Sequence, residues 1–182
     1  MLALASAEIF SRQYRRPSVM TLRNNASRTD REIGLLMAML RLASLISRPM
    51  RDGVADLAGF SFNELRILMA LSGEGESAGH DLAELMGMQA MNVSRALASL
   101  HAMNLVEPAK NSGNRRRKPY RISARGAKTY VAMKPNIAQI ARFLFGILTP
   151  RERASLRRLL AKLDERVPQW QPSERRPHVP RA

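Results

Sequence analysis

The chain has 182 residues, with 30 lysines and arginines against 15 aspartates and glutamates, and it contains no cysteine. This length predicts one domain with tails, and the lack of cysteine excludes disulfides and thiolate metal sites. The formal net charge of +15 favours a nucleic acid or an anionic lipid over a neutral partner, but charge alone does not choose between these two.

The first 29 residues contain five arginines among serine, asparagine and proline and lack helical periodicity, so residues 1–29 are expected to form a flexible basic arm. No basic stretch precedes the short apolar run from Met1 to Ile9, so a secretory signal is not expected and the protein should stay in the cytoplasm. The longest apolar run, Ile33 to Ile46, is too short to cross a hydrocarbon layer of about 30 Å as a helix. We therefore expect no membrane span.

The first predicted helix covers about residues 31–48. Asp30 should precede it and Pro49 should stop it. Its apolar side chains lie on more than one stripe, which predicts burial on two sides. One of these sides is expected to contact a second subunit.

A capping box predicts the start of a second helix. Ser61 and Glu64 have the required spacing, in which the hydroxyl and the carboxylate accept hydrogen bonds from amides at the helix start. This helix should cover about residues 62–71, before Gly73 and Gly75.

The next two helices, over about residues 80–86 and 90–103, have the pattern of a helix-turn-helix. Ala83 is a small residue where the helices cross, Gly87 makes the turn, and Val93 is a branched apolar residue for the core.

The second helix of this pair has two different faces. Its inward face is apolar, whereas its outward face is polar at the start and small later. An outward face of this kind suits a helix whose N-terminal half enters the DNA major groove, and a solvated surface face is the alternative. The inward residues are Val93, Ala96, Leu97 and Leu100, and the outward face is centred on Met91, Arg95, Ala98 and Ala102.

A β-hairpin with a basic loop is predicted directly afterwards. Pro108 and Pro119 sit where strand edges tolerate a missing amide. Between Lys110 and Lys128 there are eight lysines or arginines and no acid. Four of them stand in a row, and they either bind DNA phosphates or form a solvated charge run: Arg115, Arg116, Arg117 and Lys118.

A fifth helix is predicted over about residues 124–146, with Ser123 as its cap. Pro135 should kink or split it, because proline lacks the amide hydrogen and clashes with the preceding turn. The last helix should cover about residues 150–166. The proline-rich residues 167–182 are expected to be disordered.

A series of short motifs runs in order along the chain: Leu82-Ala83-Glu84, Gly87-Met88, Val93-Ser94-Arg95, Leu100, Asn104-Leu105-Val106, Ile122-Ser123-Ala124-Arg125-Gly126 and Leu148-Thr149-Pro150-Arg151-Glu152-Arg153. Together they resemble the MarR family of winged-helix transcription regulators. No single motif is diagnostic, and the order and spacing carry the resemblance. With the first helix included, the likeness covers about three quarters of the chain.

The resemblance implies a mainly α fold with a small β-hairpin wing, a winged helix-turn-helix over residues 30–166 whose DNA-binding part is about 60–123. It implies a symmetric homodimer joined by the N- and C-terminal helices, with a recognition helix in the major groove and a wing in the minor groove of double-stranded DNA. It also implies control by a small molecule. The residues that we expect at the DNA are Gln89, Asn92, Ser94, Arg95, Ser99, Arg115, Arg116, Arg117 and Lys118.

The wing departs from the family's pattern in one respect. The family usually carries an aspartate two residues before an arginine, an ion pair that shapes the hairpin, whereas this chain has Asn114 before Arg116. The wing is therefore expected to be more mobile, with Arg116 freer to enter a narrow minor groove. On this hypothesis Asn114→Asp leaves DNA affinity intact or raises it, and a large loss of binding would contradict it.

Two arginines are candidates for an effector site. Arg41 is the only charge in an otherwise apolar stretch of the first helix, and Arg66 lies on the second helix. The alternative for both is a structural salt bridge or a surface side chain whose apolar stem lies along the protein. The histidines are too scattered for a metal triad, so no metal or other cofactor is expected: His80, His101 and His178.

The leading functional hypothesis is a ligand-responsive repressor. It would bind a pseudo-palindromic operator as a homodimer and be released by a small aromatic or anionic effector. The alternative is an architectural protein that coats nucleic acid through charge without reading sequence. An enzyme is not expected, because the sequence contains no Gly-rich phosphate loop, nucleophile elbow or metal motif.

Overall fold

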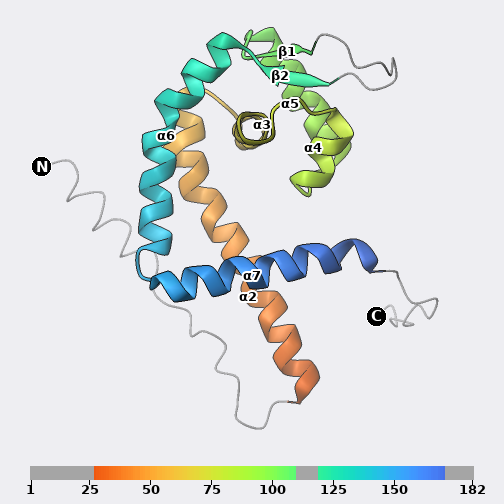
Figure 1. Ribbon diagram of the computed structural model, residues 1–182, viewed down its shortest axis with the longest axis vertical. Helices are drawn as coiled ribbons and strands as arrows, with labels where there is room; N and C mark the ends of the chain where they lie inside the picture. The colour runs from red at the N-terminus through yellow and green to blue at the C-terminus, as the bar shows by residue number, and fades with distance from the viewer. Residues whose placement is uncertain (1–26, 110–118, 171–182) are drawn as a thin grey trace, which may run out of the picture. The chain divides into compact units, whose positions relative to one another are not determined.

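The computed structural model describes residues 27–109 and 119–170. The chain divides into two compact units, Met1–Arg66 and Ile67–Ala182. The described residues form helices and one two-stranded antiparallel sheet, which confirms the mainly α fold with a small β-hairpin (Figure 1).

The first unit begins with α2, which covers Arg28–Met50. Ser27 is its N-cap, and the Ser27 hydroxyl accepts a hydrogen bond from the amide of Asp30 at 3.1 Å. The Asp30 carboxylate accepts in return from the amide of Ser27 at 3.1 Å. The expectation that Asp30 precedes the helix is therefore wrong, because this reciprocal capping box starts the helix earlier. Residues 28 and 29 of the predicted N-terminal arm belong to α2, and residues 1–26 of that arm lie outside the described part of the chain.

Pro49 does not stop α2, contrary to the prediction. The helix continues to Met50 and is followed by a π-helical turn over Arg51–Ala55 and a 3₁₀ turn over Asp56–Ala58. The chain continues past the proline because the amide of Arg51 bonds to carbonyl oxygens in the preceding turn. Gly59, with a left-handed φ of 74°, ends this helical stretch.

The helical stretch Arg28–Ala58 is long and apolar enough, by length and composition, to span a membrane. The most apolar part of this stretch is not buried. The apolar run from Ile33 to Ile46 is by itself too short to span a membrane, but the helical stretch extends well beyond that run. Helices that pack in soluble proteins pass the same length and composition test.

The helix α3, Phe62–Glu74, runs across the boundary between the two units. Its predicted capping box is confirmed: the amide of Glu64 donates to the Ser61 hydroxyl at 3.2 Å, and the amide of Ser61 donates to the Glu64 carboxylate at 2.5 Å. The helix continues through Gly73 and ends before Gly75, whose φ is 80°. The predicted end at residue 71 is therefore too early.

The second unit contains the predicted helix-turn-helix and hairpin. The helices are α4, Gly79–Leu85, and α5, Ala90–Ala102, and the strands are β1, Val106–Pro108, and β2, Tyr120–Ile122. They lie close together in Figure 1. Their shared core consists of side chains that are at most 4% exposed: Leu82, Val93, Ala96, Leu97, Leu100, Leu105 and Val106.

The chain then forms α6, Ala124–Phe145, and α7, Pro150–Arg166. Pro135 lies inside α6 and does not split it. A short 3₁₀ helix, Val167–Gln169, follows α7, so the expectation of disorder from residue 167 onward is wrong for its first residues. Residues 171–182, the remainder of that predicted tail, lie outside the described part of the chain.

A candidate nucleic-acid interface

The turn between α4 and α5 depends on a left-handed glycine. Gly87 has a φ of 56°, a conformation that other residues rarely adopt. The turn is closed by a hydrogen bond from the amide of Met88 to the carbonyl oxygen of Ala83 at 2.9 Å. This geometry confirms the predicted role of Gly87 and sets the angle at which α5 leaves the turn.

The helix α5 has the two faces that its sequence predicts. Val93, Ala96, Leu97 and Leu100 are buried, while Met91, Arg95, Ala98 and Ala102 are exposed. Burial of one face fixes the rotation of the helix, so the opposite side is available to a large ligand.

The candidate DNA-contacting residues of α5 lie at or beside this exposed face. Ser94 and Arg95 are exposed, whereas Asn92 and Ser99 are half-buried at its edges. Gln89 is the N-cap residue, is exposed, and makes no side-chain hydrogen bond to the helix start. The side-chain amide of Gln89 is therefore not used to cap the helix, although N-cap side chains commonly make such a bond.

The hairpin carries a cross-strand ion pair that the sequence analysis missed. Glu107 and Arg121 face each other in the antiparallel register. The Glu107 Oε1 atom lies 2.9 Å from Arg121 Nε and 2.7 Å from an Arg121 terminal nitrogen. Both side chains are about half exposed, which makes this a modest stabilising contact at the base of the hairpin.

The base of the hairpin is also tied to both helices of the helix-turn-helix. Ser77, just before α4, exchanges two backbone hydrogen bonds with Tyr120, of 3.0 and 2.9 Å. At the end of α5, His101 Nδ1 lies 3.1 Å from the carbonyl oxygen of Val106, and its ring meets that of Tyr120 edge-on with centroids 6.1 Å apart. These contacts fix the base of the hairpin beside the C-terminal end of α5.

The candidate residues Arg115, Arg116, Arg117 and Lys118 lie outside the described residues, as does Asn114. The described residues that flank this segment are joined by a hydrogen bond from the amide of Ala109 to the carbonyl oxygen of Pro119 at 2.9 Å. The described basic residues that follow it, Arg121, Arg125 and Lys128, are all exposed.

The two arginines proposed for an effector site differ in their surroundings. Arg41 is exposed on α2. Arg66 on α3 is partly buried, with its guanidinium carbon 5.8 Å from the centre of the Phe62 ring. Burial lowers the pKa of Arg66 below its usual value. Arginine nevertheless stays charged in proteins, so both side chains are able to attract an anion.

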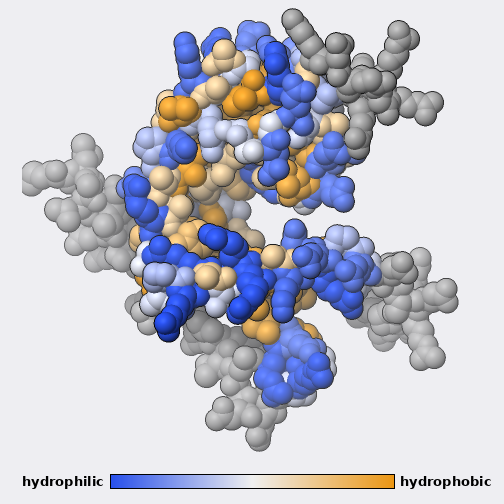
Figure 2. Space-filling view, in the orientation of Figure 1, coloured by the Kyte–Doolittle hydropathy of each residue, from blue (hydrophilic) through white to orange (hydrophobic). Residues whose placement is uncertain are grey.

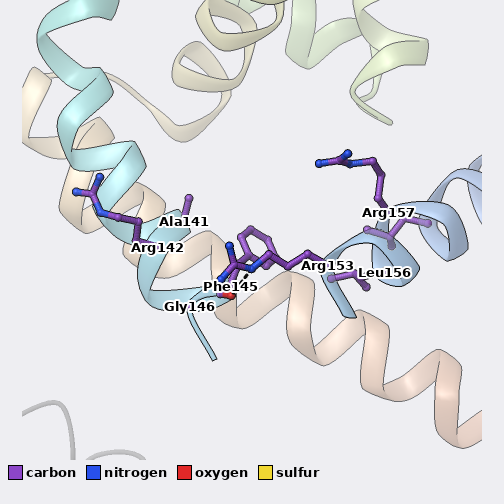
Figure 3. Close-up of a pocket in the computed structure, with 8 residues that line it drawn as sticks. Ala141, Arg142, Phe145, Gly146, Arg153, Leu156 and Arg157 are labelled. Atoms are coloured by element: carbon purple, nitrogen blue, oxygen red, sulfur yellow. Dashed lines mark hydrogen bonds between the residues drawn. The ribbon is translucent and has the colours of Figure 1, made fainter. Parts of the chain in front are cut away.

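A cavity of about 770 Å³ lies at the junction of α6 and α7. In the close-up, Phe145 and Arg153 lie together at the turn, and the Arg142 and Arg157 side chains extend from different helices (Figure 3). Arg153 Nε donates to the carbonyl oxygens of Phe145 and Leu148, each at 3.1 Å, so it holds the turn. Neither Arg41 nor Arg66 lines this cavity, whose lining residues are Ala141, Arg142, Phe145, Gly146, Arg153, Leu156, Arg157 and Leu160.

Residues 27–109 and 119–170 contain no group of three or more histidine, aspartate or glutamate side chains placed to hold a metal ion. His80 Nε2 lies 2.9 Å from a carboxylate oxygen of its neighbour Asp81 on α4. This is a local surface contact.

Buried and exposed faces, a left-handed turn and an attached hairpin together define a winged helix-turn-helix protein. Residues 58–117 match the sequence model described as the MarR family. The resemblance to this family drawn from the sequence is therefore confirmed over the matched segment.

Solved structures share the fold at low sequence identity. A MarR-family regulator from Silicibacter pomeroyi is 21% identical with a TM-score of 0.67, and the alignment covers 77% of this chain and 93% of that one. The regulator BldR from Sulfolobus solfataricus is 17% identical with a TM-score of 0.66, covering 80% of this chain and 100% of that one. The DNA binding of Bordetella bronchiseptica BpsR is regulated by 6-hydroxynicotinic acid. BpsR is 21% identical with a TM-score of 0.61, and the alignment covers 71% of this chain and 91% of that one. No curated protein sequence matches the chain.

Proposed function

We propose that this protein is a sequence-specific DNA-binding transcription regulator. The observation that carries the proposal is α5, whose apolar face is buried and whose exposed face presents Arg95 beside a structurally anchored hairpin. A helix held in this way suits the DNA major groove, where side chains reach base edges. The net charge of +15 adds attraction to phosphates.

The candidate residues divide into two roles. Arg95 is proposed to read a base edge, with Gln89 and Asn92 placed near the start of the same helix. Ser94 and Ser99 are suited to phosphates or base edges. The basic segment Arg115, Arg116, Arg117 and Lys118 is proposed to hold the backbone and enter the minor groove, where narrow grooves attract arginine.

The proposed active form is a homodimer that binds a pseudo-palindromic operator with half-sites about one helical turn apart. Exposed apolar side chains on two helices, α2 and α7, support the proposal that a second copy of the chain binds there. On α2, side chains such as Leu35 and Leu40 are 64% and 55% exposed. On α7, much of the face toward the viewer in Figure 2 is hydrophilic, yet Leu159, Leu160 and Leu163 remain between 44% and 54% exposed. Burial of such apolar surface drives association.

A membrane is the competing explanation for the exposed apolar surface of α2. We favour the dimer because Arg41 lies within the apolar stretch, and a charge at the centre of a bilayer is expensive. The start of α2 is also polar, with an Arg28–Glu32 ion pair at 2.9 Å. The proposed location is the cytoplasm. Purification without detergent as a dimer, measured by analytical ultracentrifugation, would support this view, whereas recovery only from the membrane fraction would contradict it.

A small aromatic or anionic effector is proposed to release the protein from DNA, which would make it a repressor. The regulation of BpsR by 6-hydroxynicotinic acid, an aromatic carboxylic acid, supports this part. Arg41 and Arg66 are the proposed anion-binding side chains. A ligand acts this way only if it binds the DNA-incompetent state more tightly. The proposed role requires neither catalysis nor a cofactor.

The effector proposal is tested by titrating aromatic carboxylic acids against a protein–operator complex. Release of the operator should require a higher acid concentration for Arg66→Gln or Arg41→Gln than for the unchanged protein. Equal release curves for all three proteins would reject both arginines as the anion-binding residues, and no release by any acid of this class would reject the proposed class of effector.

The DNA-binding proposal is tested by selecting genomic fragments with the purified protein at near-physiological salt, in parallel with Arg95→Ala. Arg158→Ala is the matched control, because Arg158 is an exposed arginine on α7, outside the helix-turn-helix. The proposal predicts a short inverted repeat that the unchanged protein and Arg158→Ala recover and Arg95→Ala loses. Uniform recovery by all three would favour the alternative, an architectural protein that binds nucleic acid without sequence readout.

A further inference from the structure

The most exposed large apolar side chain of α5 stands in its first turn. Met91 is the second residue of the helix and is 62% exposed. Single apolar side chains are ordinary on protein surfaces, so exposure alone says little. The position says more, because this turn belongs to the half of α5 that is proposed to enter the major groove.

Met91 lies on the same ridge as Arg95. Residues four apart share one face of a helix, and the ridge continues through Ala98 and Ala102, all of them exposed. Arg95 is thus the only polar side chain of the four. The small side chains of the two alanines allow the helix to approach another surface closely. The flexible, unbranched thioether of Met91 adapts to an uneven surface.

We infer that Met91 is a specificity-determining residue that contacts the C5-methyl group of a thymine in the operator. The inference rests on the proposed function. In the major groove, thymine is distinguished by this methyl group, which apolar side chains contact, whereas arginine pairs with the edge of guanine. A methionine one turn before an arginine therefore fits a thymine close to a guanine.

The geometry limits how far apart these bases lie. One helical turn rises about 5.4 Å, and successive bases along a strand are about 3.4 Å apart. Met91 and Arg95 therefore address base pairs within about two steps of each other. Each half-site should contain a thymine at that distance from the guanine that Arg95 contacts.

The test replaces each thymine of the recovered operator by uracil, which removes only the methyl group. The dissociation constant is measured for the unchanged protein, Met91→Ala, Met91→Leu and Leu85→Ala. At one position in each half-site, uracil should raise the dissociation constant of the unchanged protein by about fourfold per half-site. This is the factor expected from burying one methyl group. Met91→Ala should bind both operators equally, while Met91→Leu should keep a response.

Leu85→Ala is the matched control, since Leu85 is a 52% exposed apolar residue on α4, and it should keep the full response to uracil. The inference is overturned if no uracil position weakens the unchanged protein, or if Met91→Ala responds as strongly as the unchanged protein. In both cases selective binding of the operator would leave the proposed function standing. If the protein instead recovers no operator at all, the proposed function itself fails, and this inference fails with it.

Discussion

The hydroxyl of Ser123 donates a hydrogen bond to the carbonyl oxygen of Asn104 at 2.7 Å, joining two residues that are nineteen positions apart. The same hydroxyl oxygen accepts from the amide of Gly126 at 2.9 Å and so caps α6. Asn104 is held in a left-handed conformation with a φ of 58°. One side chain therefore links the end of α5, across the hairpin, to the start of α6.

Ser123→Ala should lower the free energy of unfolding by about 1–2 kcal/mol, because it removes a helix cap and leaves a half-buried carbonyl without its donor. Urea unfolding followed by circular dichroism measures the change. Ser72→Ala is the control, because Ser72 is exposed near the end of α3, and it should change stability by less than about 0.5 kcal/mol. Equal effects of the two substitutions would show that the Ser123 link carries no stability.

Gly126→Ala should destabilise the protein more strongly. A Cβ atom at this position would collide with the backbone carbonyl of Leu105, and backbone does not move aside as a flexible side chain does. We expect a loss of about 3 kcal/mol, the upper end of what overpacking typically costs, seen as a large fall in Tm or as failure to fold.

Gly73→Ala is the matched control for Gly126→Ala, since Gly73 is helical and has no atom within 4 Å of the added Cβ. It should raise stability by up to about 1 kcal/mol, because alanine favours helix over glycine. A neutral Gly126→Ala would contradict the close packing of α6 against the loop before β1.

The Glu107–Arg121 pair at the base of the hairpin should have a small coupling energy. A double-mutant cycle with Glu107→Gln and Arg121→Gln is expected to give about 0.2–1 kcal/mol in unfolding, because both side chains are half exposed and screened by water. The coupling should shrink in about 1 M salt. A coupling that is unchanged by salt would show that the contact is not electrostatic.

Thr149 should hold the pKa of Glu152 below its usual value. The larger cause of the lowered pKa is the hydrogen bond that the Thr149 backbone amide donates to the Glu152 carboxylate, and the smaller cause is the hydrogen bond from the Thr149 hydroxyl. Desolvation of the carboxylate raises the pKa and so opposes both. Because the folded-state pKa is depressed, the stabilisation is complete above the ordinary value of 4.5 and is lost as the pH falls through the lower folded value.

An NMR titration of the Glu152 side chain measures this shift directly. Thr149→Val keeps the shape of the side chain but removes the hydroxyl, so the pKa of Glu152 should move toward its ordinary value while remaining below it, owing to the backbone bond. An identical titration in both proteins would show that the hydroxyl does not contribute.

Periodicity allowed the orientation of α5 to be predicted. Its inward residues, such as Val93 and Leu100, recur at helical spacing, and burial follows directly from that pattern. The turn at Gly87 was predictable for a similar reason, because a glycine between two helical patterns indicates a left-handed residue.

The boundaries of α2 were mispredicted because two residues have more than one role. Asp30 is able to serve as an N-cap or as the third residue of a capping box, and Ser27 decides between them. Pro49 usually ends a helix, but here the turn continues through hydrogen bonds from Arg51. Competing local signals of this kind are resolved by neighbouring residues, which is why boundaries are the least predictable part of a helix.

The contacts around the base of the hairpin left no signal in the sequence. Tyr120 pairs with Ser77, more than forty positions earlier, and His101 meets Tyr120 only because α5 ends beside β2. Long-range contacts of this kind follow from the tertiary fold rather than from local composition. In the sequence, His101 stands out only as a possible metal ligand, so its place beside the hairpin could not be predicted.

The central claim, that α5 reads sequence, is tested most directly by the ratio of dissociation constants for the recovered operator and a scrambled duplex of equal length and composition. The ratio is measured at one salt concentration for the unchanged protein, Arg95→Ala and Arg158→Ala. We predict that Arg95→Ala reduces the preference for the operator by about tenfold or more, the value of one lost base contact, while Arg158→Ala keeps it. An Arg95→Ala protein that binds both duplexes more weakly by the same factor would contradict the claim.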